Sequence, residues 1–250
     1  MNNIYISIVS HGHEDMIVNN AELLKISMLE FVFVIIKDNL CSDKLKQFCQ
    51  EKELHYIRSS NPMGFGCNNN HVFDYASNIG LDFEDWFLVI NPDVNISINE
   101  FLKLKACLTV SKSSLLTVDL YSDKYLTVSD DSLRFYPGYS SLLNLVRGRP
   151  VTDSYNKQNL NNLSEVEWAS GAFLIFQAGL YHNLSGFDKK YFMYYEDVDI
   201  CFRANKLFNS KVTFLKGIKA YHKGAFANRR IFSKHFWWYI SSLFKFLVGR

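Results

Sequence analysis

Three acidic residues, Glu196, Asp197 and Asp199, fall within four positions and follow directly on the aromatic-rich residues 191–195. A pair of carboxylates beside aromatic rings can act as a general base next to a platform that binds a sugar. The same residues would suit the first turn of a helix, because the positive end of the helix dipole favours carboxylates. We interpret the segment as the edge of an active site, and a well-capped helix is the alternative.

Polar residues also follow two predicted strands in the first half of the chain. Asp38 comes after the apolar residues 31–36, and Asn91-Pro92-Asp93 comes after the apolar residues 86–90. Ligands of parallel α/β sheets bind at the carboxyl ends of the strands, and Mg²⁺ is held there by one or two carboxylates and by phosphate oxygens. Asp93 is therefore a candidate for holding a nucleotide-bound cation, although Asn-Pro is also a common turn former.

A glycine-rich segment precedes a predicted helix at residues 71–78. It contains Gly64 and Gly66, followed by asparagines at positions 68–70. Glycines permit a close approach of the backbone, and the amides can cap the helix or contact a polar ligand such as a nucleotide. A plain junction between a loop and a helix would use the same residues, so both interpretations stay open.

Two later residues could also contact a ligand. Trp168 is followed by the small residues 169–172, which leave room for a ligand beside the indole, and a packed tryptophan is the alternative. His222 follows a predicted strand at residues 218–221 and lies close to Gly224. A single histidine at a strand end is usually structural, but this imidazole could complete the coordination of a metal begun by Asp93.

The elements that must position these residues alternate between strands and helices. Apolar runs predict strands at residues 4–9, 31–36, 54–58, 86–90, 115–121, 125–128, 133–136, 166–176, 212–215 and 218–221, and helices are predicted at residues 15–28, 43–50, 71–78, 97–111 and 196–208. This pattern predicts an α/β fold with a central, mostly parallel sheet flanked by helices. The polar residues 147–164 are interpreted as an insertion. Its Arg147, Arg149 and Lys157 are expected to be solvated charges, and a mobile position near phosphate is the alternative.

Composition narrows the class of protein. The 250 residues contain no linker-like segment, so we expect one domain. A formal net charge of +2 is too small to indicate nucleic-acid binding. Five cysteines form no C-x-x-C pair, and the N-terminus resembles a strand and not a secretory signal, which favours reduced thiols in the cytoplasm.

The last stretch, residues 229–247, mixes bulky aromatics with basic residues over a helical length. Such a helix can lie in a membrane interface, with its aromatics inward and its cations toward anionic lipid. It is too short and too charged to span a bilayer. The alternative is a helix that packs on the core of the protein.

In their order and spacing, these segments resemble the inverting glycosyltransferases of family 2, and within them the rhamnosyltransferases that assemble bacterial O-antigen. The resemblance covers nearly the whole chain. It implies a single GT-A type domain over residues 1–228, in which residues 1–112 bind the nucleotide sugar and residues 113–228 bind the acceptor and carry out catalysis. Residues 229–250 would form a C-terminal amphipathic helix.

The resemblance also implies roles for single residues. Asp197 would be the catalytic base, and Asp93 would bind Mg²⁺ or Mn²⁺, assisted by His222. Asn91 stands where many relatives have the first aspartate of an Asp-x-Asp motif, and Asp38 would contact the nucleotide base. The remaining predicted contacts to the nucleotide sugar are Ser10, His11, Asn39, Gly64, Phe65 and Asn69, and the predicted contacts to the acceptor are Trp168, Gly171 and Glu196.

The implied reaction transfers L-rhamnose from dTDP-L-rhamnose to a saccharide on a polyprenyl diphosphate carrier. It would take place at the cytoplasmic face of the inner membrane, with the protein bound peripherally. A galactofuranosyl- or hexosyltransferase that uses a UDP-sugar is an alternative within the same class. A sugar- or nucleotide-binding module without catalytic activity is the alternative from a different class.

Overall fold

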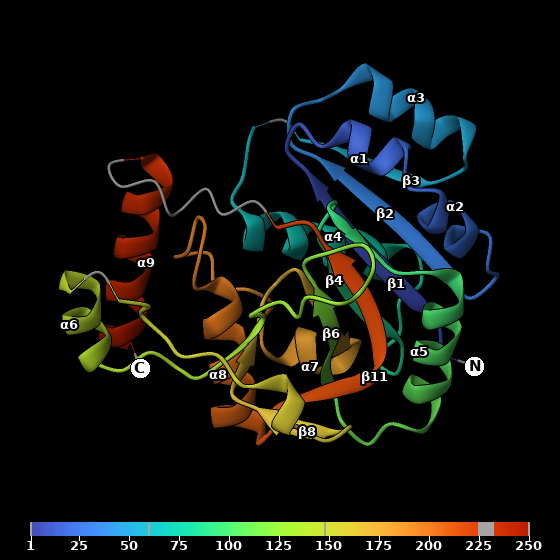
Figure 1. Ribbon diagram of the computed structural model, residues 1–250. Helices are drawn as coiled ribbons and strands as arrows, with labels where there is room; N and C mark the ends of the chain where they lie inside the picture. The colour runs from blue at the N-terminus through green and yellow to red at the C-terminus, as the bar shows by residue number, and fades with distance from the viewer. Residues whose placement is uncertain (1, 60, 148, 225–232, 250) are drawn as a thin grey trace.

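Apolar, β-branched runs form the centre of the molecule, in a computed structural model that describes residues 2–59, 61–147, 149–224 and 233–249. Among these residues, nine strands join in one sheet (Figure 1). Its first half is parallel and has the order β3-β2-β1-β4. These strands are β1 (Ile4–Ser10), β2 (Val32–Asp38), β3 (His55–Arg58) and β4 (Trp86–Ile90).

The second half of the sheet is mixed. Strand β10 (Phe173–Gln177) is antiparallel to β4 and to β6 (Leu115–Tyr121), whereas β11 (Val212–His222) is parallel to β6. Strands β5 (Val94–Asn95) and β8 (Ser164–Val166) pair antiparallel with β11. The predicted α/β fold is confirmed, and the parallel arrangement prevails in the first half of the sheet.

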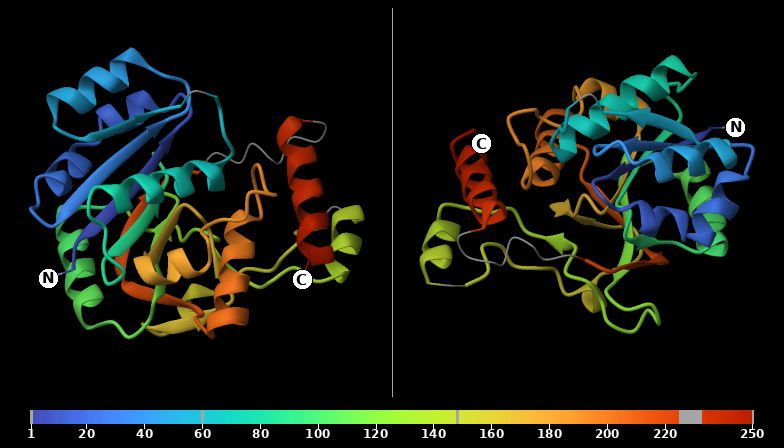
Figure 2. Two further views of the ribbon diagram at one scale, coloured as in Figure 1. Left: turned by 180° about the vertical axis from the view of Figure 1, so that it is seen from behind. Right: turned by 90° about the horizontal axis from the view of Figure 1, so that it is seen from above.

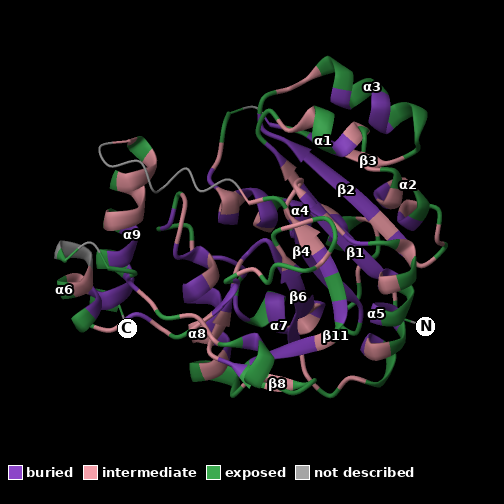
Figure 3. Cartoon of the chain, viewed as in Figure 1, coloured by how far each residue is buried: buried purple, intermediate pink, exposed green. Residues whose placement is uncertain are grey.

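Helices cover both faces of the sheet, as Figure 1 shows, and the strands between them are largely buried (Figure 3). On one face the core is completed by α1 (Glu14–Val18), α2 (Ala21–Ser27), α3 (Asp43–Glu51) and α5 (Ile98–Val110). On the other face it is completed by α4 (Phe65–Asn78), α7 (Ala178–Asn183) and α8 (Glu196–Phe208). A short pair of strands, β7 (Leu133–Arg134) and β9 (Trp168–Ala169), forms a second small sheet.

The C-terminal helix α9 (Lys234–Gly249) lies beside α6 (Ser140–Val146), apart from the main sheet (Figure 2). Its buried side chains Leu243, Phe246 and Leu247 form a third apolar cluster with Tyr191, Tyr195, Val198 and Val151. Each such buried side chain contributes about 1.5–3 kcal/mol. The helix therefore packs on the protein along one side. Residues 225–232, on which the predicted domain boundary at 228 falls, lie outside the described residues. No described helix combines the length and the apolar character needed to cross a bilayer.

Several predicted elements differ in the structure. The helix predicted at residues 15–28 is divided into α1 and α2, because the side chain of Asn20 accepts a hydrogen bond from Leu23 N and starts a new helix. The strand predicted at 166–176 is interrupted between β9 and β10, where Gly171 lies. The predicted strands 212–215 and 218–221 are one strand with an irregular register. Residues 125–128 form no strand.

The predicted insertion at residues 147–164 contains the 3-10 helix η1 (Lys157–Asn159) and leads into β8. Arg147 and Arg149 are exposed, but the side chain of Lys157 is only 6% exposed. Its Nζ lies 3.2 Å from Asp119 Oδ1 and donates a hydrogen bond of 2.9 Å to Leu120 O. The prediction of a solvated charge is wrong for Lys157, because a carboxylate on β6 compensates for its burial.

Candidate active site

The predicted base Asp197 lies at the start of α8, where the backbone takes an unusual path. Tyr194 and Tyr195 precede the helix with φ angles of 69° and 66°, in the left-handed region. Residues other than glycine adopt this region at a cost of order 1–3 kcal/mol each, and such residues cluster at active sites. The carboxylate of Asp197 is fixed by two backbone donors, Gly171 N at 3.0 Å and Val198 N at 2.9 Å.

Glu196 and Asp197 are adjacent carboxylates, of which Glu196 is buried and Asp197 is partly buried. Burial raises the pKa of Glu196 well above its usual value, and the neighbouring charge of Asp197 raises it further. Burial also raises the pKa of Asp197, but the hydrogen bonds from Gly171 and Val198 oppose the rise. Because Asp197 has these donors, it is the member of the pair that ionises first, and Glu196 retains the proton. Oε2 of Glu196 is buried without a hydrogen-bond partner among the described residues.

The glycine-rich segment predicted to be a loop is the first turn of α4, which begins at Phe65 with Gly64 as its N-cap. A Cβ atom on Gly64 would lie 2.0 Å from the backbone oxygen of Phe192, and Phe65 N donates to that oxygen at 3.2 Å. A Cβ atom on Gly171 would lie 3.2 Å from the ring of Phe65 and 3.5 Å from Cβ of Asp197. Small residues therefore bring α4, the β9–β10 turn and the start of α8 together.

The asparagines of α4 serve mainly to hold this arrangement. Asn69 is fully buried, and its side chain accepts a hydrogen bond from Ser7 Oγ and donates one to Phe65 O. The side-chain amide of Asn70 donates a hydrogen bond from Nδ2 to Phe187 O and accepts one at Oδ1 from Phe187 N. Asn69 thus connects α4 with β1, and its contact with a nucleotide sugar stays a prediction.

Asp38 and Asn39 lie together with Ser10 and His11 at the ends of β1 and β2. Asp38 is 1% exposed and accepts hydrogen bonds from Leu40 N, Ser42 N and Tyr56 Oη. The amide of Asn39 contacts the backbone of Met63 and lies 3.5 Å from Nδ1 of His11, which is exposed. Asn39 N also donates to Ser10 O at 2.9 Å. The four predicted nucleotide-site residues are therefore neighbours, with His11 the most accessible of them.

Asp93 and His222 are brought together by the pairing of β5 with β11. His222 pairs with Val94 in the sheet, and its Nε2 lies 3.7 Å from Asp93 Oδ1. Asp93 Oδ2 accepts a hydrogen bond of 3.1 Å from Gly224 N. A carboxylate and an imidazole in this relation fit a divalent cation that takes its remaining ligands from a diphosphate. Asp93 and His222 would hold Mg²⁺ or Mn²⁺, although no group of three or more potential ligands occurs among the described residues.

The cation candidate and the base candidate lie at the same end of the sheet. Asn91, at the end of β4, donates its backbone N–H to Ala172 O at 3.0 Å. The adjacent Gly171 donates to Asp197. Two hydrogen bonds therefore connect the segment that carries Asp93 with the start of α8.

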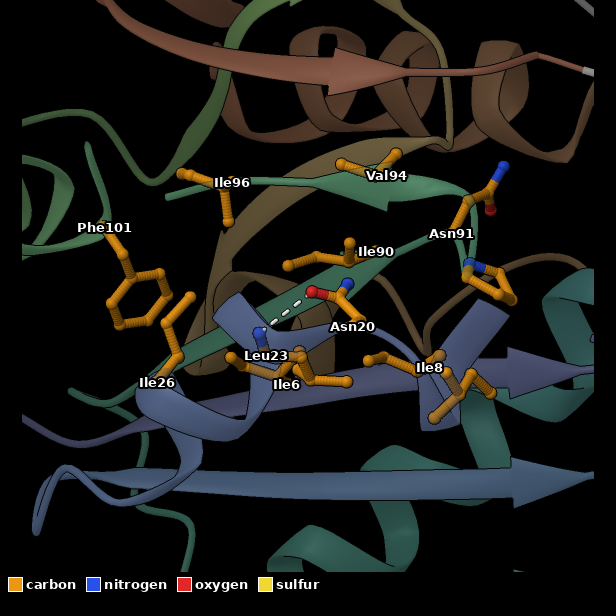
Figure 4. A pocket seen from close by; sticks show the side chains of 12 residues that line it. Ile6, Ile8, Asn20, Leu23, Ile26, Ile90, Asn91, Val94, Ile96 and Phe101 are labelled. Atoms are coloured by element: carbon orange, nitrogen blue, oxygen red, sulfur yellow. Dashed lines mark hydrogen bonds between the residues drawn. The ribbon is translucent and has the colours of Figure 1, made fainter. Parts of the chain in front are cut away.

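A small cavity beneath this strand end is part of the core and not of the candidate site. Its volume is about 20 Å³, enough for roughly one water molecule, and Ile6, Ile90 and Val94 are among its mostly apolar lining residues (Figure 4). The side chain of Asn91 borders it and points away from it in Figure 4.

Trp168 contributes to the small β7–β9 sheet. Its Nε1 donates to Phe135 O at 2.9 Å, and Trp168 pairs with Arg134. Arg134 is fixed by hydrogen bonds to the side chain and the backbone of Thr152, and its positive charge opposes the rise that burial causes in the pKa of Asp197.

Two residues near the site were missed by sequence reasoning, Arg134 and Asp130. Asp130 Oδ2 lies 2.8 Å from Nδ1 of His222. Both residues lie on segments without a motif, and only the folded chain brings them to Asp197 and His222.

Comparison with known proteins gives the family. No protein-family model matches the chain. The chain is 32% identical over 250 residues to the rhamnosyltransferase WbbL of Escherichia coli K12, covering 99% of this chain and 93% of that relative. It is 24% identical over 196 residues to the N-acetylglucosaminyl-diphospho-decaprenol L-rhamnosyltransferase of Mycobacterium tuberculosis H37Rv, covering 70% of this chain and 61% of that relative.

Solved structures share the fold of this chain. It matches the crystal structure of GalNAc-T7 with UDP, GalNAc and Mn²⁺ with a TM-score of 0.65 at 11% identity, over 89% of this chain and 44% of that chain. The predicted GT-A fold is therefore confirmed. Together with the full-length similarity to WbbL, it shows that the chain belongs to the family 2 rhamnosyltransferases.

Proposed function

We propose that this glycosyltransferase transfers L-rhamnose from dTDP-L-rhamnose to a saccharide carried on a polyprenyl diphosphate, with inversion at the anomeric carbon. The name of the mycobacterial relative, which specifies a lipid diphosphate acceptor, supports this class of acceptor. The observation that carries the proposal is the connection of Asp93 to Asp197 through the hydrogen bonds of Asn91 and Gly171. It supports a leaving-group site at Asp93 and a base at Asp197 that act at the same end of the sheet.

Asp197 takes the proton from an acceptor hydroxyl while that oxygen attacks the anomeric carbon from the face opposite the nucleoside diphosphate. The backbone donors Gly171 and Val198 hold the carboxylate in one orientation before the acceptor binds. Asp93 and His222 would hold a divalent cation, which would supply positive charge next to the leaving diphosphate.

A donor panel tests the proposal. Purified protein with Mn²⁺ is incubated with a short polyprenyl diphosphate N-acetylglucosamine acceptor and with dTDP-L-rhamnose or UDP-hexoses, and products are identified by mass. We expect a product 146 mass units heavier, roughly the mass of a rhamnosyl residue, only with dTDP-L-rhamnose. Transfer from a UDP-hexose and not from dTDP-L-rhamnose would show that the proposed donor is wrong. Absence of transfer from every donor would overturn the proposal.

We also propose peripheral attachment to the cytoplasmic face of the inner membrane through α9. The side of α9 that does not pack on the protein carries Trp237, Phe244 and Val248, which are 59%, 57% and 74% exposed. Lys234 and Lys245 belong to the same helix, and the neighbouring α6 carries Leu143 at 58% exposure. Exposed aromatics combined with cations favour an interface that contains anionic lipid.

Sedimentation with vesicles tests the attachment. We expect wild-type protein to sediment with vesicles that contain anionic lipid at low salt, and a Trp237→Ser/Phe244→Ser variant to remain in the supernatant. Met28→Ser, at a position 84% exposed directly after α2, is the control and should sediment like wild type. Equal sedimentation of all three proteins would exclude α9 as the attachment site.

A further inference from the structure

Asp130 lies outside every segment in which the sequence indicated chemistry. It belongs to the segment between β6 and β7, which passes beside the end of β11 (Figure 1). The side chains of Asp130 and His222 are each 13% exposed, and Asp130 Oδ2 lies 2.8 Å from Nδ1 of His222. The other ring nitrogen, Nε2, faces Asp93 Oδ1 at 3.7 Å. The imidazole is thus held between two carboxylates, one at each nitrogen.

We propose that Asp130 is a positioning residue for the metal site: it accepts the Nδ1–H of His222 and so directs the Nε2 lone pair to the cation that His222 shares with Asp93. This inference rests on the proposed metal role of Asp93 and His222. It assigns Asp130 no contact with the cation, because its carboxylate is bonded to the nitrogen on the opposite side of the ring from Asp93.

The chemistry of the imidazole explains why such a partner matters. A neutral imidazole carries one proton, and the nitrogen without it is the one that can coordinate a metal. A carboxylate at Nδ1 selects the tautomer with the proton on Nδ1, fixes the plane of the ring and makes Nε2 a better donor. Without Asp130, the ring could rotate or carry its proton on Nε2, and both changes remove the ligand.

Hydrogen bonds within residues 120–130 fix the position of Asp130. Asp130 N donates to Leu120 O at 3.0 Å, and Ser122 N donates to Val128 O at 2.9 Å. The carboxylate of Asp123 accepts hydrogen bonds from Tyr125, Thr127 and Val128 inside the turn.

The predicted insertion supports the same segment from the other side. Buried Lys157 also donates to Leu120 O at 2.9 Å. Leu120 O therefore accepts hydrogen bonds from both Asp130 and Lys157. Through this oxygen, residues 147–164 help to hold the residue that contacts His222.

The first test measures the metal directly. Mn²⁺ is titrated into metal-free protein in the presence of dTDP, and free Mn²⁺ is followed by electron paramagnetic resonance. We expect Asp130→Ala to weaken Mn²⁺ binding by about 10–100-fold, as is typical for the partner of a ligating histidine. Asp130→Asn should fall between Asp130→Ala and wild type, because its amide oxygen still accepts the Nδ1–H. Asp131→Asn changes the adjacent, exposed carboxylate and should bind Mn²⁺ like wild type.

His222→Ala and the double variant Asp130→Ala/His222→Ala complete a cycle. If Asp130 acts through His222, the double variant binds Mn²⁺ no more weakly than His222→Ala. A weakened His222→Ala with an unchanged Asp130→Ala would overturn the positioning role and leave the proposed function standing. An unchanged His222→Ala would overturn the metal role of His222 and the positioning role with it.

The second test needs no metal. The ¹⁵N chemical shifts of the His222 ring, assigned by comparison with His222→Gln, report which nitrogen is protonated at a pH where the ring is neutral. We expect the Nδ1–H tautomer in wild type and in Asp130→Asn, and a mixture of tautomers in Asp130→Ala. The Nε2–H tautomer in wild type would contradict the proposal. Thermal unfolding of each variant confirms that it is folded, and Asp130→Asn keeps the test decisive if Asp130→Ala unfolds.

Discussion

The backbone N–H of Gly171 donates a hydrogen bond of 3.0 Å to Oδ2 of Asp197. Gly171 lies in the turn before β10, and its neighbour Ala172 accepts a hydrogen bond from Asn91 at the end of β4. The position of Asp197 relative to the end of β4 is therefore set by backbone hydrogen bonds.

Asp197→Asn should abolish most of the transfer while leaving donor binding intact. The amide has nearly the shape of the carboxylate but cannot take a proton, so we expect kcat to fall by about 10²–10⁴-fold. The NH₂ group of the asparagine would face one of the two backbone N–H groups that donate to the carboxylate, so the midpoint of thermal unfolding should lie below that of wild type. Product formation and thermal unfolding measure the two effects. Asp74→Asn, at an exposed position on α4, is the control and should have the activity of wild type. Near-normal turnover of Asp197→Asn would show that Asp197 is not the base.

The pH dependence of kcat should reflect the raised pKa of Asp197. Burial raises this pKa above the usual value of 3.8, and the base works only when it is ionised, so activity is lost as the pH falls through the raised value. The acid limb of the profile should therefore lie at a higher pH than a free aspartate would give. Glu196→Gln should leave the limb where it is in wild type, because Glu196 is still protonated and neutral when Asp197 ionises. A limb that moves to lower pH in Glu196→Gln would show that Glu196 carries a charge when Asp197 ionises, and would contradict the order of ionisation.

The same shift has a consequence for stability. A carboxyl group whose pKa is raised in the folded state binds more protons there than in the unfolded chain. Its contribution to the free energy of unfolding therefore decreases as the pH rises from 3.8 through the raised pKa. An ionised Asp197, which the proposed reaction requires, therefore lowers the free energy of unfolding of the protein at the pH of catalysis.

The sequence was sufficient for elements with strong local signals. Helix α8 has the predicted bounds, 196–208, because its acidic first turn marks its start, and the buried strand β4 was likewise found from its apolar run. The glycine-rich segment was misassigned as a loop. Its glycines look like loop residues, but in the fold they allow α4 to approach Phe192 and Phe187.

Other features depended on contacts between distant segments. Lys157 was expected in solvent because nothing near it in sequence indicates Asp119 as a partner. Asp130 and Arg134 carry no motif, and they join the site only through the pairing of β11 with β6 and of β7 with β9. Residue type therefore indicated the chemistry of the site, whereas the residues that orient its side chains required the folded chain.

Gly64→Ala should destabilise the protein and reduce its activity. The added Cβ would lie 2.0 Å from the backbone oxygen of Phe192, and backbone cannot give way as a side chain can. We expect a loss of about 1–3 kcal/mol in the free energy of unfolding, measured in urea. Gly217→Ala is the matched control, because a Cβ there meets no atom within 4 Å, and it should change stability by less than about 0.5 kcal/mol. Equal stability of the two variants would mean that α4 does not approach Phe192 closely.

Lys157→Met should be the most destabilising of these single substitutions. The side chains of Lys157 and Asp119 are 6% and 5% exposed, so the substitution leaves a buried carboxylate without its cation. Removal of one partner of such a pair costs about 3–5 kcal/mol, which urea unfolding would detect as a lower midpoint. Lys211→Met breaks the exposed pair with Glu165 and should cost at most about 1 kcal/mol. Adding Asp119→Leu to Lys157→Met should restore part of the loss, since it removes the unpaired charge, and a double variant less stable than Lys157→Met would contradict the pairing.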